Sequence, residues 1–228
     1  MAWEPFELAA SGYAEWYTTR RGRRVDQAEC DLLTWLLESF PSATSALEIG
    51  CGTGQFSHRL RDRLGQVVGL DRSPAMLWEL RRRSPATPAI LADAHRLPFG
   101  DATVDLVVYV TALEFLEYPA QTLREAVRVA RQGLLLVVLN RWSLGGLSRR
   151  WGPQAQQLVL GQARDCSLID LQATVKEGAG QRLREMRWRS TLFPNGAWRL
   201  RLPIPLGDVV GLAALISLPP EGEVVNDC

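Results

Sequence analysis

The sequence LEIGCGTGQFS, residues 47–57, places a short apolar run directly before three glycines at alternate positions. The run from Ala46 to Ile49 has the length of a buried strand, and a helical pattern begins at about Gln55. Glycine at alternate positions permits positive φ and removes Cβ atoms where a ligand must approach the backbone. The free N–H groups of a helix N-terminus lie at the same place. The stretch therefore predicts a strand, a tight turn and a helix that cradle a ligand.

The spacing of the glycines distinguishes two kinds of nucleotide-binding turn. A dinucleotide fingerprint has the pattern GxGxxG, in which the third glycine packs the helix beside a pyrophosphate. This chain instead has Gly50, Gly52 and Gly54 in the pattern GxGxG, preceded by Glu48. The run EIGCGTG resembles the first motif of the class I methyltransferases that use S-adenosylmethionine as cofactor. An NAD-dependent oxidoreductase is therefore a distant alternative.

A second apolar run, Val67 to Asp71, predicts a strand that ends in a carboxylate, with Ser73 as the N-cap and Pro74 as the first residue of the next helix. Asp71 follows the glycines at close to the spacing at which an acidic side chain meets a ribose in nucleotide-binding α/β folds. A carboxylate there can accept hydrogen bonds from both ribose hydroxyls. The alternative is a solvated aspartate in a loop, and the glycine turn upstream favours the ribose contact.

Residues 89–94 predict a third strand, which again closes on a carboxylate. In the methyltransferases that the chain resembles, the matching aspartate accepts a hydrogen bond from the adenine amino group, and the next backbone N–H serves a ring nitrogen. Those positions are Asp93 and Ala94 here. The segments 97–99 and 104–110 then resemble the LPF and DLV run that leads into the fourth strand of the family.

The loop after that strand, Thr111 to Phe115, bears on the substrate. Amino methyltransferases that act on nucleic acids or proteins often carry Asn-Pro-Pro-Tyr there, and this chain does not. The leading hypothesis is therefore methyl transfer by in-line displacement to a small, apolar or aromatic acceptor. A protein or RNA methyltransferase and a non-catalytic cofactor-binding partner subunit are the alternatives.

The resemblance covers residues 10–140 well and extends more loosely toward the C-terminus. It implies an α/β fold, a Rossmann-like three-layer αβα sandwich with a seven-stranded, mostly parallel sheet whose last strand is antiparallel. The branch that it resembles includes the ubiquinone- and menaquinone-biosynthesis C-methyltransferases. The residue pattern predicts a strand over 133–139, a helix from a Ser167 and Asp170 capping box to Gly178, and a closing antiparallel hairpin of 186–193 and 209–217.

Residues 1–45 are expected to form an aromatic arm and a covering helix, since apolar residues recur at helical spacing from Val25 to Phe40. In the resembled family a tyrosine near the position of Tyr13 often lies over the cofactor. The alternative is that the aromatic residues only pack this lid onto the methyltransferase domain, residues 46–228. Residues 141–166 mix tryptophan with arginine and are expected to form a substrate cap, with ordinary packing or a membrane or partner surface as the other interpretations.

The resemblance assigns the cofactor site to residues around the glycine turn and the strand ends. They are Tyr13, Glu48, Gly50, Cys51, Gly52, Gly54, Asp71, Arg72, Met76, Asp93, Ala94 and Thr111. No catalytic base is assigned, because transfer from a sulfonium needs one only when the acceptor carries a proton that must leave. Glu114 and Tyr109 are nearer to the expected acceptor region, but Tyr109 could equally face the packed side of the sheet. His95 is expected to border the cofactor or solvent.

Composition limits the remaining possibilities. The chain has 228 residues, 46% of them hydrophobic, and a net charge of +1, which gives no case for bulk nucleic-acid binding. Its four cysteines lack a CxxC pair, and no histidine stands at metal-ligand spacing, so no metal site is expected and reduced thiols indicate a cytoplasmic protein. No signal peptide or transmembrane segment is expected. The expected partner is a small-molecule acceptor.

Overall fold

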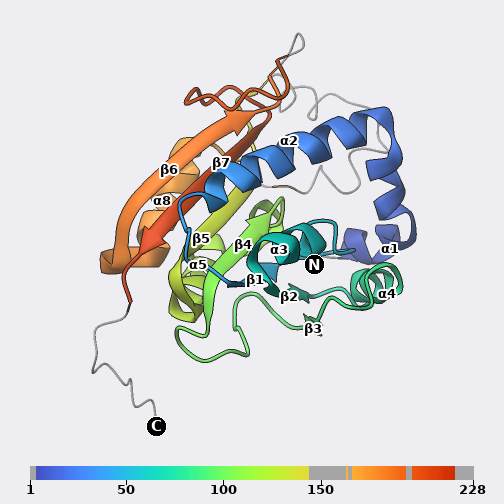
Figure 1. Ribbon diagram of the computed structural model, residues 1–228, viewed down its shortest axis with the longest axis horizontal. Coiled ribbons are helices and arrows are strands. Elements are labelled where there is room, and N and C mark those ends of the chain that lie inside the picture. The colour runs from blue at the N-terminus through green and yellow to red at the C-terminus, as the bar shows by residue number, and fades with distance from the viewer. Residues whose placement is uncertain (1–3, 144–162, 164–165, 194–196, 219–228) are drawn as a thin grey trace.

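Seven strands form one sheet in the order β3-β2-β1-β4-β5-β7-β6 (Figure 1). The computed structural model describes residues 4–143, 163, 166–193 and 197–218. The strands are β1 (Ser45–Ile49), β2 (Gln66–Asp71), β3 (Ala89–Leu91), β4 (Val104–Val110), β5 (Ala130–Leu139), β6 (Leu183–Thr191) and β7 (Val209–Ile216). Strands β1 to β5 pair in parallel, and β7 pairs antiparallel with both β5 and β6. The predicted mostly parallel sheet with a closing antiparallel strand is confirmed.

The middle of the sheet is buried on both faces. Every residue of β4 is buried, which explains why this strand reads as a continuous apolar run instead of an alternating one. Successive side chains of β4 point to opposite faces of the sheet. Val107 and Tyr109 lie in the core on one face, and Leu106 and Val108 lie in the core on the other. Two helical layers must therefore cover the sheet.

Those layers are separate in sequence and in space. The helices are α1 (Glu4–Tyr13), α2 (Arg20–Leu37), α3 (Ser57–Leu64), α4 (Pro74–Arg83), α5 (Pro119–Val129) and α8 (Leu168–Ala179), with short 3-10 helices at Ala14–Thr18, Leu113–Phe115 and Gly180–Arg182. Apolar side chains of α2 and α3 pack into one core, and those of α5 and α8 into the other. Figure 1 shows α2 lying across β5, β6 and β7, with α5 and α8 behind the sheet. Within the described segments, no helix combines the length and apolarity that a bilayer span requires.

The covering helix begins earlier than the apolar pattern predicts. It was expected from Val25, but α2 begins at Arg20, because Thr19 Oγ1 accepts the N–H of Gly22 at 2.9 Å and caps the helix. Its first turn is polar, so apolar periodicity gives no sign of it. Gly22 also lies against the preceding 3-10 helix, where a Cβ would come within 2.0 Å of the carbonyl oxygen of Trp16.

The helix α8 has the predicted beginning and a different end. Ser167 and Asp170 form the predicted capping box, in which each side chain serves the backbone N–H of the other. Gly178 does not end the helix but lies inside it. Glycine is needed at this position because a Cβ would be 2.6 Å from Leu123 Cβ on α5. The helix ends at Ala179, and Gly180, whose φ is +52°, is its C-cap.

The strand predicted over 89–94 ends at Leu91, so Asp93 lies in the loop that follows β3. The predicted substrate cap, 141–166, lies almost wholly outside the described residues, which include only 141–143, 163 and 166 of it.

Asp105 joins the beginning of β1 to β4. Its Oδ2 accepts from the backbone N–H groups of Thr44 and Ser45 at 2.9 and 3.1 Å, and from their hydroxyls at 3.1 and 3.0 Å. Burial alone would raise the pKa of this carboxyl, but the hydrogen bonds to its charged form hold the pKa below the ordinary value. The carboxylate therefore stabilises the strand pair at the end opposite the glycine turn.

We expect Asp105→Ala to lower the free energy of unfolding by about 2–4 kcal/mol, because four donors lose a charged acceptor. Urea denaturation at neutral pH measures the change. Asp101→Ala is the control, since the Asp101 side chain is 64% exposed and its ion pair with Arg128 should be worth less than about 1 kcal/mol. Equal losses in the two variants would contradict the role given to Asp105.

Candidate functional site

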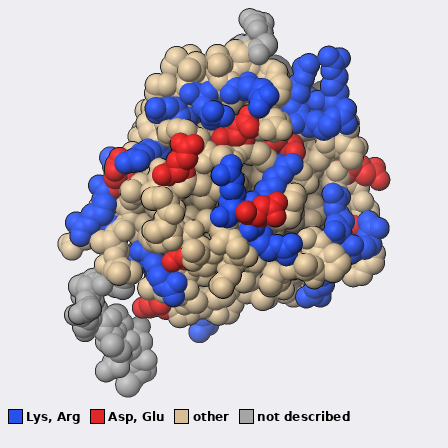
Figure 2. Space-filling model, in the orientation of Figure 1, with Lys and Arg blue, Asp and Glu red and all other residues tan. Residues whose placement is uncertain are grey.

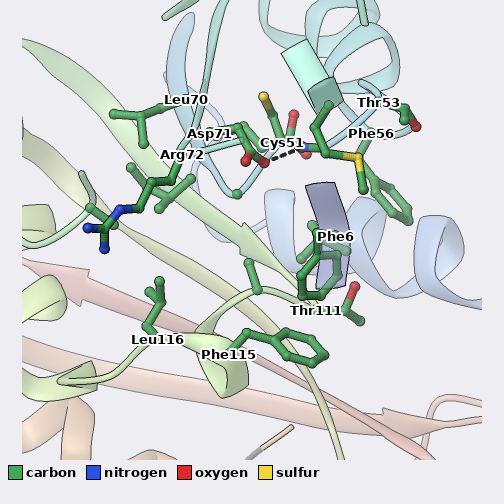
Figure 3. Close-up of a pocket in the computed structure, with 18 of the residues that line it drawn as sticks. Phe6, Cys51, Thr53, Phe56, Leu70, Asp71, Arg72, Thr111, Phe115 and Leu116 are labelled. Carbon is green, nitrogen blue, oxygen red and sulfur yellow. Dashed lines mark hydrogen bonds between the residues drawn. The ribbon is translucent and has the colours of Figure 1, made fainter. Parts of the chain in front are cut away.

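A pocket lies at the carboxyl ends of β1, β2 and β4, with α1 and the 3-10 helix after it along one side (Figure 3). The rings of Phe6 on α1 and Phe115 in the loop after β4 meet edge to face, with centroids 4.9 Å apart. The lining comprises Phe6, Tyr13, Tyr17, Glu48, Ile49, Gly50, Cys51, Gly52, Thr53, Gln55, Phe56, Leu70, Asp71, Arg72, Met76, Ala92, Asp93, Ala94, His95, Val110, Thr111, Ala112, Phe115, Leu116 and Glu117. The open edge of the sheet, the glycine turn and the N-terminal arm thus meet in one place.

The glycine turn takes the conformation that its sequence predicts. Gly50 and Gly52 have φ of +70° and +52°, values that disfavour any residue with a Cβ. A Cβ at Gly50 would lie 2.6 Å from Ala112 Cβ, in the loop after β4. At Gly52 it would meet only Met76 Sδ, at 3.9 Å. Gly50 is therefore required by packing, whereas Gly52 leaves open space beside the pocket.

Asp71 holds this turn to the next helix. Its Oδ2 accepts the N–H of Gly52 at 2.8 Å and its Oδ1 accepts the N–H of Ser73 at 2.9 Å. Burial raises the pKa of Asp71, and these backbone hydrogen bonds oppose that rise. A carboxylate has about four acceptor positions. Asp71 can therefore serve the fold and still accept hydrogen bonds from a ligand in the pocket.

Asp93, in the loop after β3, forms a second polar group at the pocket. It accepts from the backbone N–H of His95 at 2.9 Å and lies 2.6 Å from His95 Nδ1. The other ring nitrogen of His95 accepts the N–H of Tyr118 at 3.2 Å, so the proton is on Nδ1 and is donated to Asp93. Partial burial would raise the pKa of Asp93, but these bonds and the charge of Arg72, 3.5 Å away, lower it. Asp93 is therefore an ionised acceptor.

Two residues of the glycine motif face inward. Glu48 is buried and accepts the Ser57 hydroxyl, and burial raises its pKa to about 7 in spite of that bond. Cys51 is also buried, and burial raises its thiol pKa well above the ordinary value. Its sulfur fits because position 69 is glycine, where a Cβ would be 2.7 Å from Cys51 Sγ. Cys51 is a packing residue that remains a thiol, not a nucleophile.

Two threonines in the lining have unusual properties. Thr53 is 3% exposed, and its hydroxyl oxygen has no hydrogen-bond partner among the described residues. Thr111 has φ of +47°, a conformation that a β-branched residue rarely adopts, and its N–H donates to Val137 at 2.7 Å. An unpaired buried polar atom and a strained backbone both occur more often at functional sites than elsewhere.

Buried acids and phenols lie near the N-terminal arm. The hydroxyls of Tyr13 and Tyr17 are hydrogen-bonded to each other, and burial raises the pKa of Tyr13 to about 12 and that of Tyr17 well above its ordinary value. Glu29 of α2 is 3% exposed. Burial, together with the negative charges of Asp26 and Glu114, raises its pKa to about 8. At neutral pH this region therefore consists of protonated phenols and a largely protonated carboxyl.

The structure brings the predicted site residues together with one exception. All of them line the pocket except Gly54, where a Cβ would lie 3.0 Å from Leu80 of α4. Their part in binding stays a prediction. Sequence reasoning missed Phe6, Tyr17 and Phe115, although the aromatic content of the arm was a signal for the first two. Among the described residues no cluster of three potential metal ligands occurs.

Comparison with known proteins gives a family match in the same region. Residues 47–138 match the family model described as a methyltransferase domain. The chain is 37% identical over 103 residues to an uncharacterized methyltransferase of Mycobacterium bovis, a match that covers 45% of this chain and 41% of the relative. It is 35% identical over 107 residues to the malonyl-[acyl-carrier protein] O-methyltransferase of Serratia marcescens, covering 46% and 42% of the two chains. These matches span only about two fifths of the length of the relatives.

Solved structures share the fold over nearly the whole chain. A Thermotoga maritima protein described as a SAM-dependent methyltransferase, possible histamine N-methyltransferase, has a TM-score of 0.79 at 22% identity, covering 94% of this chain and 99% of its own. Magnesium protoporphyrin IX methyltransferase from Synechocystis, with bound SAH, has a TM-score of 0.63 at 17% identity, covering 92% and 96%. At these identities the similarity establishes the fold.

The raised pKa of Glu29 predicts a pH-dependent stability. The folded state keeps this carboxyl protonated up to about pH 8, whereas the unfolded chain ionises it near its ordinary value of 4.5. Stability from this group is therefore complete below about pH 4.5 and is lost as the pH rises to 8. We expect Glu29→Gln to raise Tm relative to the unsubstituted protein more at pH 8 than at about pH 5, measured by calorimetry.

The matched control is Glu38→Gln, because Glu38 is an exposed glutamate at the C-cap of α2. It should show no such difference between the two pH values. A Tm change for Glu29→Gln that is the same at both would mean that Glu29 is ionised in the folded protein.

Proposed function

We propose that the protein, whose residues 47–138 match a methyltransferase domain, transfers the methyl group of S-adenosylmethionine to a small acceptor with an apolar or aromatic surface. The observation that carries the proposal is the pocket itself. It combines a glycine turn after β1 with acidic residues after β2 and β3, at the open edge of the sheet.

The residues present fit this cofactor. The carboxylate of Asp71 suits a ribose, since its backbone hydrogen bonds do not occupy all of its roughly four acceptor positions. Asp93 is an ionised acceptor suited to the adenine amino group, with the N–H of Ala94 beside it. The turn at Gly52 leaves space for a ligand against the backbone, and the buried hydroxyl of Thr53 offers a polar contact that no described residue uses. This combination of hydrogen-bond acceptors and donors matches a nucleoside with a polar amino-acid end.

The sulfonium of the cofactor, when bound, supplies an electrophilic methyl group, so the main task of the chain is to position and enclose the acceptor. Holding two reactants in line can be worth roughly 7–11 kcal/mol of the barrier. The edge-to-face contact of Phe6 with Phe115 joins α1 to the loop after β4 and limits the entry of water on that side. Tyr13 and Tyr17 remain protonated at neutral pH, so the pair has one O–H donor beyond the one used in their mutual hydrogen bond.

The aromatic lining supports an apolar or aromatic acceptor. Phe6, Tyr13, Tyr17 and Phe115 present ring surface to the pocket. We assign residues 1–45 the role of a lid and residues 141–166 that of an acceptor cap. The family model ends at residue 138, before that second segment, so the acceptors named for relatives do not transfer directly. The malonyl-carrier relatives nevertheless make a carboxyl acceptor a useful member of a substrate screen.

Isothermal titration with S-adenosylmethionine and, separately, NAD tests the proposed cofactor. We expect micromolar binding of S-adenosylmethionine and none of NAD, because the glycine spacing lacks the third glycine of the dinucleotide turn. Binding of NAD alone would support an oxidoreductase. Binding of S-adenosylmethionine without turnover of quinols, phenols, carboxylic acids, RNA or protein would favour a non-catalytic partner subunit.

A pair of glycine substitutions tests the site assignment. Gly52 and Gly180 both have a φ of +52°, so valine should strain the backbone and lower stability at either position. Only Gly52 lines the pocket, whereas Gly180 ends α8. We expect both variants to fold and only Gly52→Val to lose S-adenosylmethionine binding in the same titration. Undiminished affinity in folded Gly52→Val would remove the turn from the cofactor site.

A further inference from the structure

The segment between β6 and β7 exposes apolar side chains in an unusual way. Residues 203–206, Pro-Ile-Pro-Leu, are four consecutive apolar residues, and all of them are exposed. Ile204 is 43% and Leu206 57% exposed, and Leu200 nearby is 50% exposed. Runs of this kind on a folded surface generally mark a contact with an apolar partner.

This exposure is fixed by the structure. Asn140, which is buried, donates from Nδ2 to the carbonyl oxygens of Pro205 at 3.0 Å and Gly207 at 2.9 Å. Ser190, also buried, donates its hydroxyl to the carbonyl oxygen of Ile204. Two buried polar side chains thus hold the backbone of the segment from below, and the aliphatic side chains remain outside.

Arginines border the apolar run. Arg199 and Arg201 are exposed and share one carboxylate, Asp31 of α2, at 3.1 and 3.9 Å. Arg189 of β6 lies over the ring of Trp35, with its guanidinium carbon 4.8 Å from the centroid. Since two guanidinium groups face a single acid, this part of the surface keeps a net positive charge.

The N-terminus of α2 adds four more cations. Arg20, Arg21, Arg23 and Arg24 are all exposed and occupy the beginning of the helix, where its dipole disfavours positive charge. They lie roughly 10–17 Å along the helix from Asp31, by its rise per residue. Figure 2 shows basic side chains gathered along the upper edge of the molecule, the edge on which Figure 1 places the N-terminal half of α2 and the segment before β7.

This surface is on the same edge of the sheet as the pocket. Val209, at the beginning of β7, pairs with Leu139 at the end of β5 and with Thr191 at the end of β6. The segment 197–206 therefore lies beyond the carboxyl ends of the parallel strands, where the pocket also lies.

We propose that the exposed apolar run 203–206, with the arginines around it, docks the protein on an anionic lipid surface. Aliphatic side chains next to guanidinium groups match a bilayer interface, where acyl chains lie beneath anionic headgroups. A nucleic acid would account for the arginines but leave the exposed isoleucine and leucine without a partner. This inference goes beyond the proposed function, and lipid binding can be measured whether or not the protein transfers methyl groups.

The test is co-sedimentation of the whole protein with vesicles of phosphatidylcholine, with and without phosphatidylglycerol. We expect binding to the anionic vesicles only, weakened by added salt. The double variant Ile204→Ser, Leu206→Ser should bind roughly tenfold or more weakly, because two inserted aliphatic side chains are lost. Charge removal in Arg20→Gln, Arg21→Gln, Arg24→Gln should reduce both the affinity and its dependence on salt.

Leu91→Ser is the matched control, since Leu91 is 58% exposed on β3, the edge strand farthest along the sheet from β6 and β7. It should bind vesicles like the unsubstituted protein, and circular dichroism should show all variants folded. Failure to bind anionic vesicles overturns the proposal. Loss of binding only in the arginine variant, with Ile204→Ser, Leu206→Ser unchanged, also overturns it and indicates adsorption by charge alone.

Discussion

The pocket depends on the carboxylate of Asp71, which joins two segments that the sequence keeps apart. One oxygen holds the N–H of Gly52 in the turn after β1, and the other holds the N–H of Ser73 before α4. The turn is further fixed to β2, since the N–H groups of Gly50 and Cys51 both donate to the carbonyl oxygen of Leu70, at 2.7 and 3.0 Å. Positive φ at the glycines is therefore a consequence of contacts on both sides of the turn. A substitution that removes these contacts would therefore change the shape of the turn even where the glycines themselves are kept.

The protonation states of the acids in and near the pocket depend on how deeply each carboxyl is buried. Asp93 is partly exposed and hydrogen-bonded by His95, and its lowered pKa keeps it charged. Glu48 and Glu29 are buried, with pKa values raised to about 7 and about 8. The acids of this region thus differ in protonation although they are chemically alike. A sequence shows the carboxyls but not this division between charged and neutral forms.

The sequence predicted the elements whose cause is local. The glycine turn, the carboxylates after β2 and β3 and the capping box at Ser167 each depend on residues within a few positions of one another. The beginning of α2 was missed because its first turn is polar, and the end of α8 because Gly178 serves a contact with Leu123 of another helix. The contact of Phe6 with Phe115 could not be predicted, since it depends on how α1 packs across the sheet edge. The sequence therefore predicted residues that line one pocket, but not the aromatic packing beside them.

Hydrogen bonds from one carboxylate hold α1 against the beginning of α4. Glu7 accepts the hydroxyl of Ser73 and the N–H of Ala75 at 3.3 Å, so α1 is held at the N-terminus of α4. Ser73 in turn caps α4 by accepting the N–H of Met76, a residue of the pocket lining. Lifting α1 must break the bonds to Glu7 and disturb this cap. Opening the pocket on the side of α1 therefore requires the hydrogen bonds of Glu7 to break, although Glu7 itself does not line the pocket.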